Sequence, residues 1–148
     1  MAMVAQAIAN NGKLMQPTLV DRVRAADLTV LSQTKPQTMA NAFSKDSADK
    51  LTTMMESVVS EANPQLAIDG IKVAAKTGTA QRGEGLVNNA MFILYAPYGD
   101  NPEIAIAIAV EKGGAGATLS PVARKIVDYY FTFQSSANTV ENAYSLLK

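Results

Sequence analysis

Ile71-Lys72-Val73-Ala74-Ala75-Lys76-Thr77-Gly78-Thr79-Ala80 is the stretch that decides the fold of this 148-residue chain. Its first half is apolar and contains β-branched side chains, which predicts a β-strand. Its second half places an ammonium group, two hydroxyls and a glycine side by side. Because glycine has no side chain, the backbone of a ligand can approach the strand there. This combination predicts one wall of a groove that binds a carboxylate.

Two apolar segments that follow, residues 90–96 and 104–110, predict two more strands of the same sheet. The connections are short, a turn around Gly83-Glu84-Gly85 and a turn cluster at 97–102, and this favours antiparallel neighbours. Isoleucine and alanine alternate along 104–110. The large side chains therefore lie on one face, and the small ones allow a helix to pack closely on the other.

Three helices are predicted around this sheet. Residues 1–9 have apolar side chains at helical spacing and end at Asn10-Asn11-Gly12, a left-handed C-cap signal. Ser44 is a suitable N-cap for a second, amphipathic helix that ends near Asn63-Pro64. Ser120 is a suitable N-cap for a third, with Pro121 at its first position. The buried stripe predicted for this third helix is Val122, Ile126, Tyr129, Tyr130 and Phe133.

The remaining segments are peripheral. Residues 17–43 mix short β-branched runs with polar breaks and predict a hairpin or meander. The glycine-rich run 113–117 is interpreted as a connection at the rim of the groove. Residues 134–148 are polar and predict a tail with one short helix over Val140, Tyr144 and Leu147. The chain is therefore expected to be α+β, with an antiparallel sheet flanked by helices.

Composition excludes several classes of function. Lysine plus arginine and aspartate plus glutamate number 13 each, and this balance gives no electrostatic case for nucleic acid as a partner. Histidine and cysteine are both absent, which removes Ser-His-Asp and Cys-His catalysis and the commonest zinc ligands. The acidic residues are scattered, so we expect no metal site and no cofactor. Acid–base chemistry falls to Lys, Tyr or a carboxylate.

Lys76-Thr77-Gly78-Thr79 resembles the third signature motif of penicillin-binding proteins and serine β-lactamases. Three further segments resemble the C-terminal part of a penicillin-binding protein transpeptidase domain, of the class B type, in the expected order. They are residues 1–17, residues 96–107 and residues 121–126. Met91, where the family often has tryptophan, and Leu94, where glycine is common, depart from the family pattern. The resemblance covers residues 1–133 as part of that domain and leaves 134–148 as a C-terminal tail.

The resemblance implies a serine acyltransferase that cross-links peptidoglycan stem peptides ending in D-Ala-D-Ala and that β-lactams trap as an acyl-enzyme. Lys76 and the Thr79 amide, an oxyanion donor, are the implied catalytic groups. Thr77, Gly78 and Thr79 are the implied substrate-binding residues. The alternatives that share this fold are a fragment of a serine β-lactamase and a non-catalytic β-lactam sensor or binding module.

The family's nucleophile lies in a Ser-x-x-Lys motif, and a Ser-x-Asn motif assists proton transfer; both are expected before residue 1. Three Ser-x-x-Lys matches begin at Ser32, Ser47 and Ser145, and Ser136-Ala137-Asn138 matches the second motif. All four lie in the wrong order or the wrong element. We therefore expect the chain alone to be inactive, with a companion chain or missing N-terminal segment supplying both motifs. The resemblance also implies the extracytoplasmic face of the bacterial cytoplasmic membrane, with an anchor in that missing part.

Overall fold

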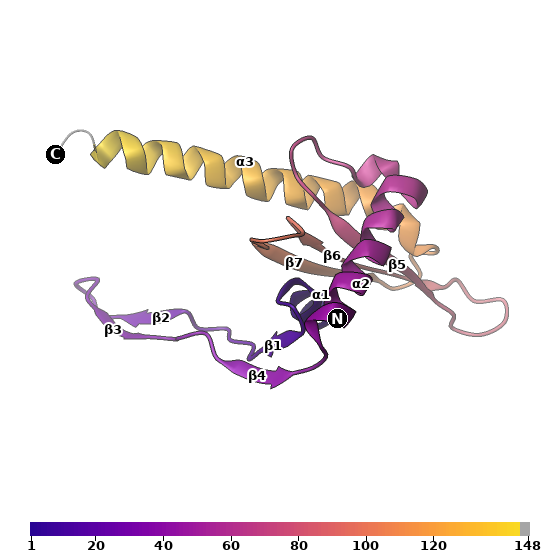
Figure 1. Ribbon diagram of the computed structural model, residues 1–148, viewed down its shortest axis with the longest axis horizontal. Coiled ribbons are helices and arrows are strands. Elements are labelled where there is room, and N and C mark those ends of the chain that lie inside the picture. The colour runs from indigo at the N-terminus through magenta and orange to yellow at the C-terminus, as the bar shows by residue number, and fades with distance from the viewer. Residues whose placement is uncertain (146–148) are drawn as a thin grey trace.

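The computed structural model describes the backbone of residues 1–145 and the side chains of residues 1–133. Two helices and a long hairpin come first, a three-stranded sheet follows, and a long helix ends the described chain (Figure 1). The elements in chain order are α1 (Ala2–Ala9), β1 (Lys13–Met15), β2 (Arg22–Arg24), β3 (Val30–Gln33), β4 (Thr38–Asn41), α2 (Lys45–Ser57), η1 (Val58–Ala62), η2 (Pro64–Leu66), β5 (Ala74–Ala80), β6 (Asn89–Ala96), β7 (Ile104–Val110), η3 (Gly116–Leu119) and α3 (Ser120–Ser145).

The three predicted strands form one antiparallel sheet in the order β5-β6-β7, as the sequence indicated. Gly78 lies opposite Met91, and Phe92 lies opposite Ile108. β5 begins at Ala74, three residues later than predicted. The reason is a tight turn before it, in which Ile71 N–H donates to Ile68 O at 3.1 Å.

The sheet lies between two layers of helices, and the alternation along β6 divides its side chains between two cores. Ala90, Phe92, Leu94 and Ala96 pack toward η1–η3 and α3, together with Leu66, Leu119 and Val127. Ile93 and Tyr95 point the other way and pack with Ala5, Ile8 and Met55 of α1 and α2. Leu94 is fully buried in the first core, so its departure from the family pattern is a change of packing.

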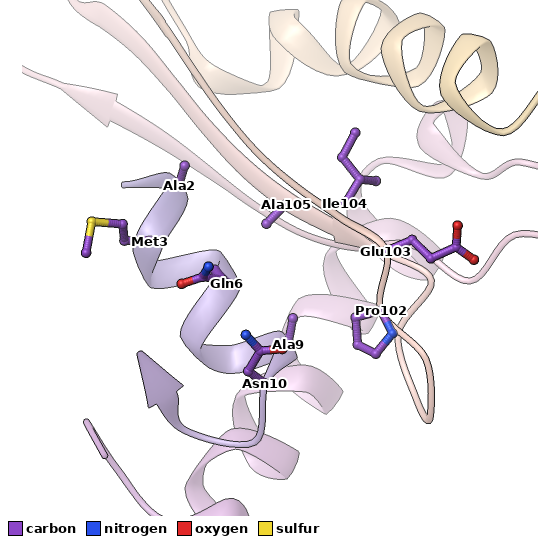
Figure 2. Close-up of a pocket in the computed structure, with 9 residues that line it drawn as sticks. All are labelled: Ala2, Met3, Gln6, Ala9, Asn10, Pro102, Glu103, Ile104 and Ala105. Carbon is purple, nitrogen blue, oxygen red and sulfur yellow. The ribbon is translucent and has the colours of Figure 1, made fainter. Parts of the chain in front are cut away.

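The alternating residues of β7 lie as predicted. The side chains of Ile104, Ile106 and Ile108 pack on the α3 side, whereas Ala105 packs with α1. Figure 2 shows α1 running beside Ala105, with the alanine side chains Ala2 and Ala9 lining the same groove. Small residues on both elements allow this close approach.

The first two helices agree with their predictions. α1 ends where Asn11 and Gly12 take positive φ values of 56° and 89°. Ser44 caps α2, because its Oγ accepts from Ser47 N–H at 3.2 Å. α2 continues as the π-helical turn η1 as far as Ala62, so the predicted end near Asn63-Pro64 is confirmed.

The stripe predicted for α3 is wrong. Val122, Ile126, Tyr129 and Phe133 are exposed, and among the described side chains of the helix the buried ones are Ser120, Ala123 and Val127. Ser120 is the first helical residue, not the cap, and its hydroxyl donates to Asn63 Oδ1 at 3.3 Å. The half-buried Phe131 continues this stripe against the same core.

The backbone of α3 runs without a break past the predicted boundary at Gln134 to Ser145. The predicted tail therefore continues the helix as far as that residue. The side chains of Val140, Tyr144 and Leu147, on which the short-helix prediction rested, lie outside the described residues. The division into residues 1–133 and 134–148 stays a prediction.

Residues 13–41 form the predicted peripheral hairpin in two sections. β1 pairs with β4, and β2 pairs with β3 further out, each antiparallel and each with an irregularity in its register. All of β2, β3 and β4 is exposed, and the outer section projects away from the sheet (Figure 1).

Candidate functional site

The Lys-Thr-Gly motif lies on β5, at one edge of the three-stranded sheet. Ala74 and Ala75 are buried and fix the start of the strand in the two cores. Lys76 and Thr79 are exposed, and Thr77 and Gly78 are half-buried. The motif is therefore accessible along an edge that no strand of the described residues covers.

The backbone of the motif alternates between the sheet and the open edge. The N and O atoms of Gly78 face Met91 O of β6. A Cβ built on Gly116 would lie within 2.7 Å of each of these three atoms, so the three are close to one another. In an antiparallel pair, successive residues point their peptide groups to opposite sides. The N–H groups of Thr77 and Thr79 therefore point away from β6, toward the open edge.

Lys76 reaches the same edge from the opposite face. The register places Lys76 beside Ile93 on the α1 side, and Thr77 and Thr79 beside Phe92 and Ala90 on the α3 side. Lys76 Nζ nevertheless donates to Thr77 O at 2.5 Å. The ammonium group of Lys76 therefore lies at the open edge of β5, although its side chain starts on the α1 side. Groups from both faces of the strand lie at this edge.

The two threonine hydroxyls have different surroundings. Thr79 Oγ1 accepts a hydrogen bond from Gly116 N–H of η3 at 3.3 Å. The Thr77 hydroxyl has no hydrogen bond among the described side chains and backbone groups. Both hydroxyls can therefore still donate a hydrogen bond to a ligand oxygen.

Gly78 lies where a side chain has little room. A Cβ at this position would be 3.3 Å from Met91 Cβ, tighter than an ordinary contact. A cavity of about 70 Å³ opens on this face, lined by Met1, Lys76, Thr77, Gly78, Met91, Phe92 and Ile93. Met91, the second departure from the family pattern, thus forms part of the wall beside the motif.

A larger cavity of about 360 Å³ lies elsewhere, between α1 and the start of β7 (Figure 2). Its polar side chains do not converge: Gln6 Oε1 accepts from Met15 N–H, and the Glu103 carboxylate points away from the helix. The cavity beside the motif is smaller than the one between α1 and β7, because the edge strand β5 forms only one of its walls. The motif, with its convergent ammonium, amide and hydroxyl groups, is the better candidate site.

Among the described residues, no group of three or more Asp or Glu side chains is placed to hold a metal ion. The expectation of no metal and no cofactor stays a prediction. The Ser-x-x-Lys match at Ser47 lies in the first turn of α2, where its Oγ is 3.1 Å from Ser44 Oγ. The match at Ser32 lies on the outer hairpin. Neither accompanies the motif on β5, and the matches at Ser136 and Ser145 fall where side chains are not described.

The Lys-Thr-Gly motif, here on an open sheet edge of a layered α+β domain, is a signature shared by penicillin-binding proteins and serine β-lactamases. Residues 1–128 match the family described as the penicillin binding protein transpeptidase domain, and the chain belongs to that family.

Named relatives agree with this assignment. The chain is 36% identical over 135 residues to the peptidoglycan D,D-transpeptidase PbpA of Mycolicibacterium smegmatis, covering 85% of this chain and 27% of the relative. It is 30% identical over 142 residues to the peptidoglycan D,D-transpeptidase MrdA of Haemophilus influenzae, covering 83% and 22%.

Solved structures agree as well. The imipenem acyl-enzyme complex of penicillin-binding protein A from M. tuberculosis has a TM-score of 0.80 at 35% identity, covering 88% of this chain and 29% of that one. The D,D-transpeptidase domain of a peptidoglycan glycosyltransferase from Eggerthella lenta has a TM-score of 0.78 at 34% identity, covering 90% and 31%. The chain thus spans less than a third of the length of these relatives.

Proposed function

We propose that this chain is part of a peptidoglycan D,D-transpeptidase that cross-links stem peptides through a serine acyl-enzyme and binds β-lactams. The observation that carries the proposal is the open edge of β5, where Lys76 Nζ, two threonine hydroxyls and outward-facing amides converge. The names of the relatives support the reaction, and a relative trapped as an imipenem acyl-enzyme supports the β-lactam chemistry.

In the proposed reaction, a serine Oγ supplied by the rest of the domain attacks the carbonyl carbon between the two D-Ala residues of a stem peptide. The terminal D-Ala leaves with a proton on its amine, and the acyl group becomes an ester of the serine. An amine on a neighbouring stem then attacks this ester, releases the serine hydroxyl and completes the cross-link.

The groups on β5 have separate roles in this proposal. The Thr79 N–H, which points to the open edge, donates to the oxyanion of each tetrahedral intermediate, together with the amide of the serine itself. Thr77 and Thr79 hydroxyls bind the terminal carboxylate, and the Lys76 charge attracts it. Gly78 lets the substrate backbone lie against the strand.

The test is covalent labelling with a fluorescent penicillin. The isolated chain should show no label, because it lacks the serine motif at a place that can reach β5. Label should appear when a companion chain, or an N-terminal segment, supplies Ser-x-x-Lys and Ser-x-Asn. In that complete domain, Thr77→Val together with Thr79→Val should slow acylation by about 10²-fold, since each lost hydrogen bond contributes about 1.5 kcal/mol.

Three outcomes would contradict the proposal. Covalent label on the isolated chain would mean that a serine within residues 1–148 is the nucleophile. Rapid nitrocefin turnover by the complete domain would indicate a β-lactamase, and tight reversible binding without label would indicate a sensor or binding module.

The proposal also locates the parent protein on the extracytoplasmic face of the cytoplasmic membrane, because peptidoglycan stems are joined there. None of the helices within the described residues combines the length and the apolar composition needed to cross a membrane. Labelling of intact spheroplasts by a penicillin that does not cross membranes tests this location.

A further inference from the structure

The 3₁₀ turn η3 rests directly on the backbone of the motif strand. A Cβ added to Gly116 would lie 2.2 Å from Gly78 O and 2.7 Å from Gly78 N. No real side chain tolerates such distances to backbone atoms, so only glycine allows η3 to lie this close. Gly116 is also buried, and its N–H donates to Thr79 Oγ1 at 3.3 Å.

The connection before η3 is fastened to the sheet independently of this contact. Lys112 N–H donates to Asn89 Oδ1 at 3.0 Å, and Gly114 N–H donates to Asn88 O at 3.0 Å. Gly113 lies so close to β6 and β7 that an added Cβ would be 2.9 Å from Ala90 Cβ. Since all seven residues of β5 pair with β6, η3 is held over the motif.

The hydrogen bond from Gly116 determines what the Thr79 hydroxyl can do. A threonine hydroxyl has one proton to donate and two lone pairs that accept. Because the Gly116 N–H already occupies one lone pair, the Thr79 proton must point away from η3. Thr79 is exposed on the open edge, so the direction left for its proton includes the open side of the strand next to Thr77.

We propose that Gly116 is a positioning residue that turns the Thr79 hydroxyl proton toward the carboxylate of the stem peptide or β-lactam. The inference rests on the proposed function, because it assigns a supporting residue to the same site. A purely structural glycine would affect all ligands alike, whereas the proposed role of Gly116 affects only the binding of the ligand carboxylate. Its effect should therefore depend on whether the ligand carries a free carboxylate.

Gly116→Ala in the complete transpeptidase tests this inference. The added methyl group should push η3 away from β5, since a four-residue turn yields more readily than a strand paired over seven residues. Acylation efficiency is measured per active molecule with benzylpenicillin and with its methyl ester, which has no carboxylate. We expect about a tenfold loss with the acid, the size of one hydrogen bond, and less than about twofold with the ester.

Three further variants make the test specific. Thr79→Val should give the same loss as Gly116→Ala with the acid, and the double variant should lose no more than Thr79→Val alone. Thr79→Ser keeps the hydroxyl, so the ratio of acylation efficiencies with the acid and the ester should equal that of the wild type. Gly114→Ala is the matched control, because it strains the same loop at a positive φ of 78° yet has no neighbour within 4 Å of its Cβ.

Equal losses with acid and ester, or additive losses in the double variant, would overturn the inference and leave the proposed function standing. Absence of label on the wild-type complete domain would overturn the proposed function instead. If Gly116→Ala does not fold, hydrogen exchange at the Gly116 amide decides: Thr79→Val should accelerate it, and Thr79→Ser should not. Unchanged exchange in Thr79→Val contradicts the inference.

Discussion

The hydroxyl of Tyr95 joins the middle strand of the sheet to α2. Tyr95 Oη lies 2.6 Å from Thr52 Oγ1, and the Thr52 hydroxyl donates to Ala48 O at 2.8 Å. Thr52 has one proton, so Tyr95 is the donor in the contact between the two side chains. Burial raises the pKa of Tyr95, and the charge of Asp49 adds to this rise.

Tyr95 should make the stability of the domain sensitive to alkaline pH. Because its pKa is raised in the folded state, its contribution is complete below the unfolded value of about 10 and is lost as pH rises through the folded value. Tyr95→Phe should lower the free energy of unfolding by about 1 kcal/mol at pH 8 and flatten its decline above pH 10. Urea unfolding between pH 8 and 11 measures both effects.

Two tyrosines serve as references in that experiment. Tyr98 donates to Glu56 Oε1 at 2.6 Å, and this bond raises its pKa, so Tyr95→Phe should keep part of the alkaline decline. Tyr129→Phe removes a phenol hydroxyl from a side chain that is 72% exposed and controls for the substitution itself. An unchanged decline in Tyr95→Phe would show that this phenol does not couple to folding.

The residues of the candidate site were predictable to different degrees. Lys76, Thr77, Gly78 and Thr79 are adjacent in the chain, so the sequence alone placed all four on one strand. Gly116 is 37 residues from Thr79, and no local pattern links a glycine-rich connection to a particular hydroxyl. Long-range contacts of single backbone groups depend on tertiary packing, which periodicity does not encode.

Among the elements, the sheet was predicted better than the helix that covers it. The strict alternation of isoleucine and alanine along β7 assigned each side chain to one face of the strand, because successive residues of a strand point to opposite faces. α3 carries two candidate stripes, and the larger side chains suggested the wrong one. The helix instead turns Ala123, Val127 and the half-buried Phe131 toward the core that contains Leu66 and Leu119.

Two valines on α3 test this assignment of its faces. Val127 is fully buried, whereas Val122 is 49% exposed. Val127→Ala in the 148-residue chain should lower the free energy of unfolding by about 2 kcal/mol, through lost burial and the cavity left behind. Val122→Ala should change it by less than about 0.5 kcal/mol. Chemical denaturation of the two variants measures the difference, and equal losses would restore the stripe predicted from sequence.

The molecule as a whole exposes many large hydrophobic side chains. Large hydrophobic side chains are exposed on the outer hairpin, on α2 and along α3, namely Leu19, Val20, Val23, Leu28, Leu31, Met54, Val122, Ile126, Tyr129 and Phe133. α3 extends past the sheet on the same side as the outer hairpin, with the edge of β7 between them (Figure 1). Such surfaces are expected where a chain spans less than a third of its relatives' length.

The isolated chain should therefore self-associate. Exposed apolar side chains on a helix and an open strand edge favour pairing between copies. Light scattering after gel filtration should show a mass that rises with concentration for the isolated chain and stays monomeric for the complete transpeptidase domain. Ile126→Glu together with Phe133→Glu should shift the isolated chain toward the monomer. Lys125→Glu, at an exposed polar position of the same helix, changes the net charge by the same amount and serves as the matched control. A chain that stays monomeric at all concentrations would mean that these side chains are tolerated in water, and that the rest of the domain need not cover them.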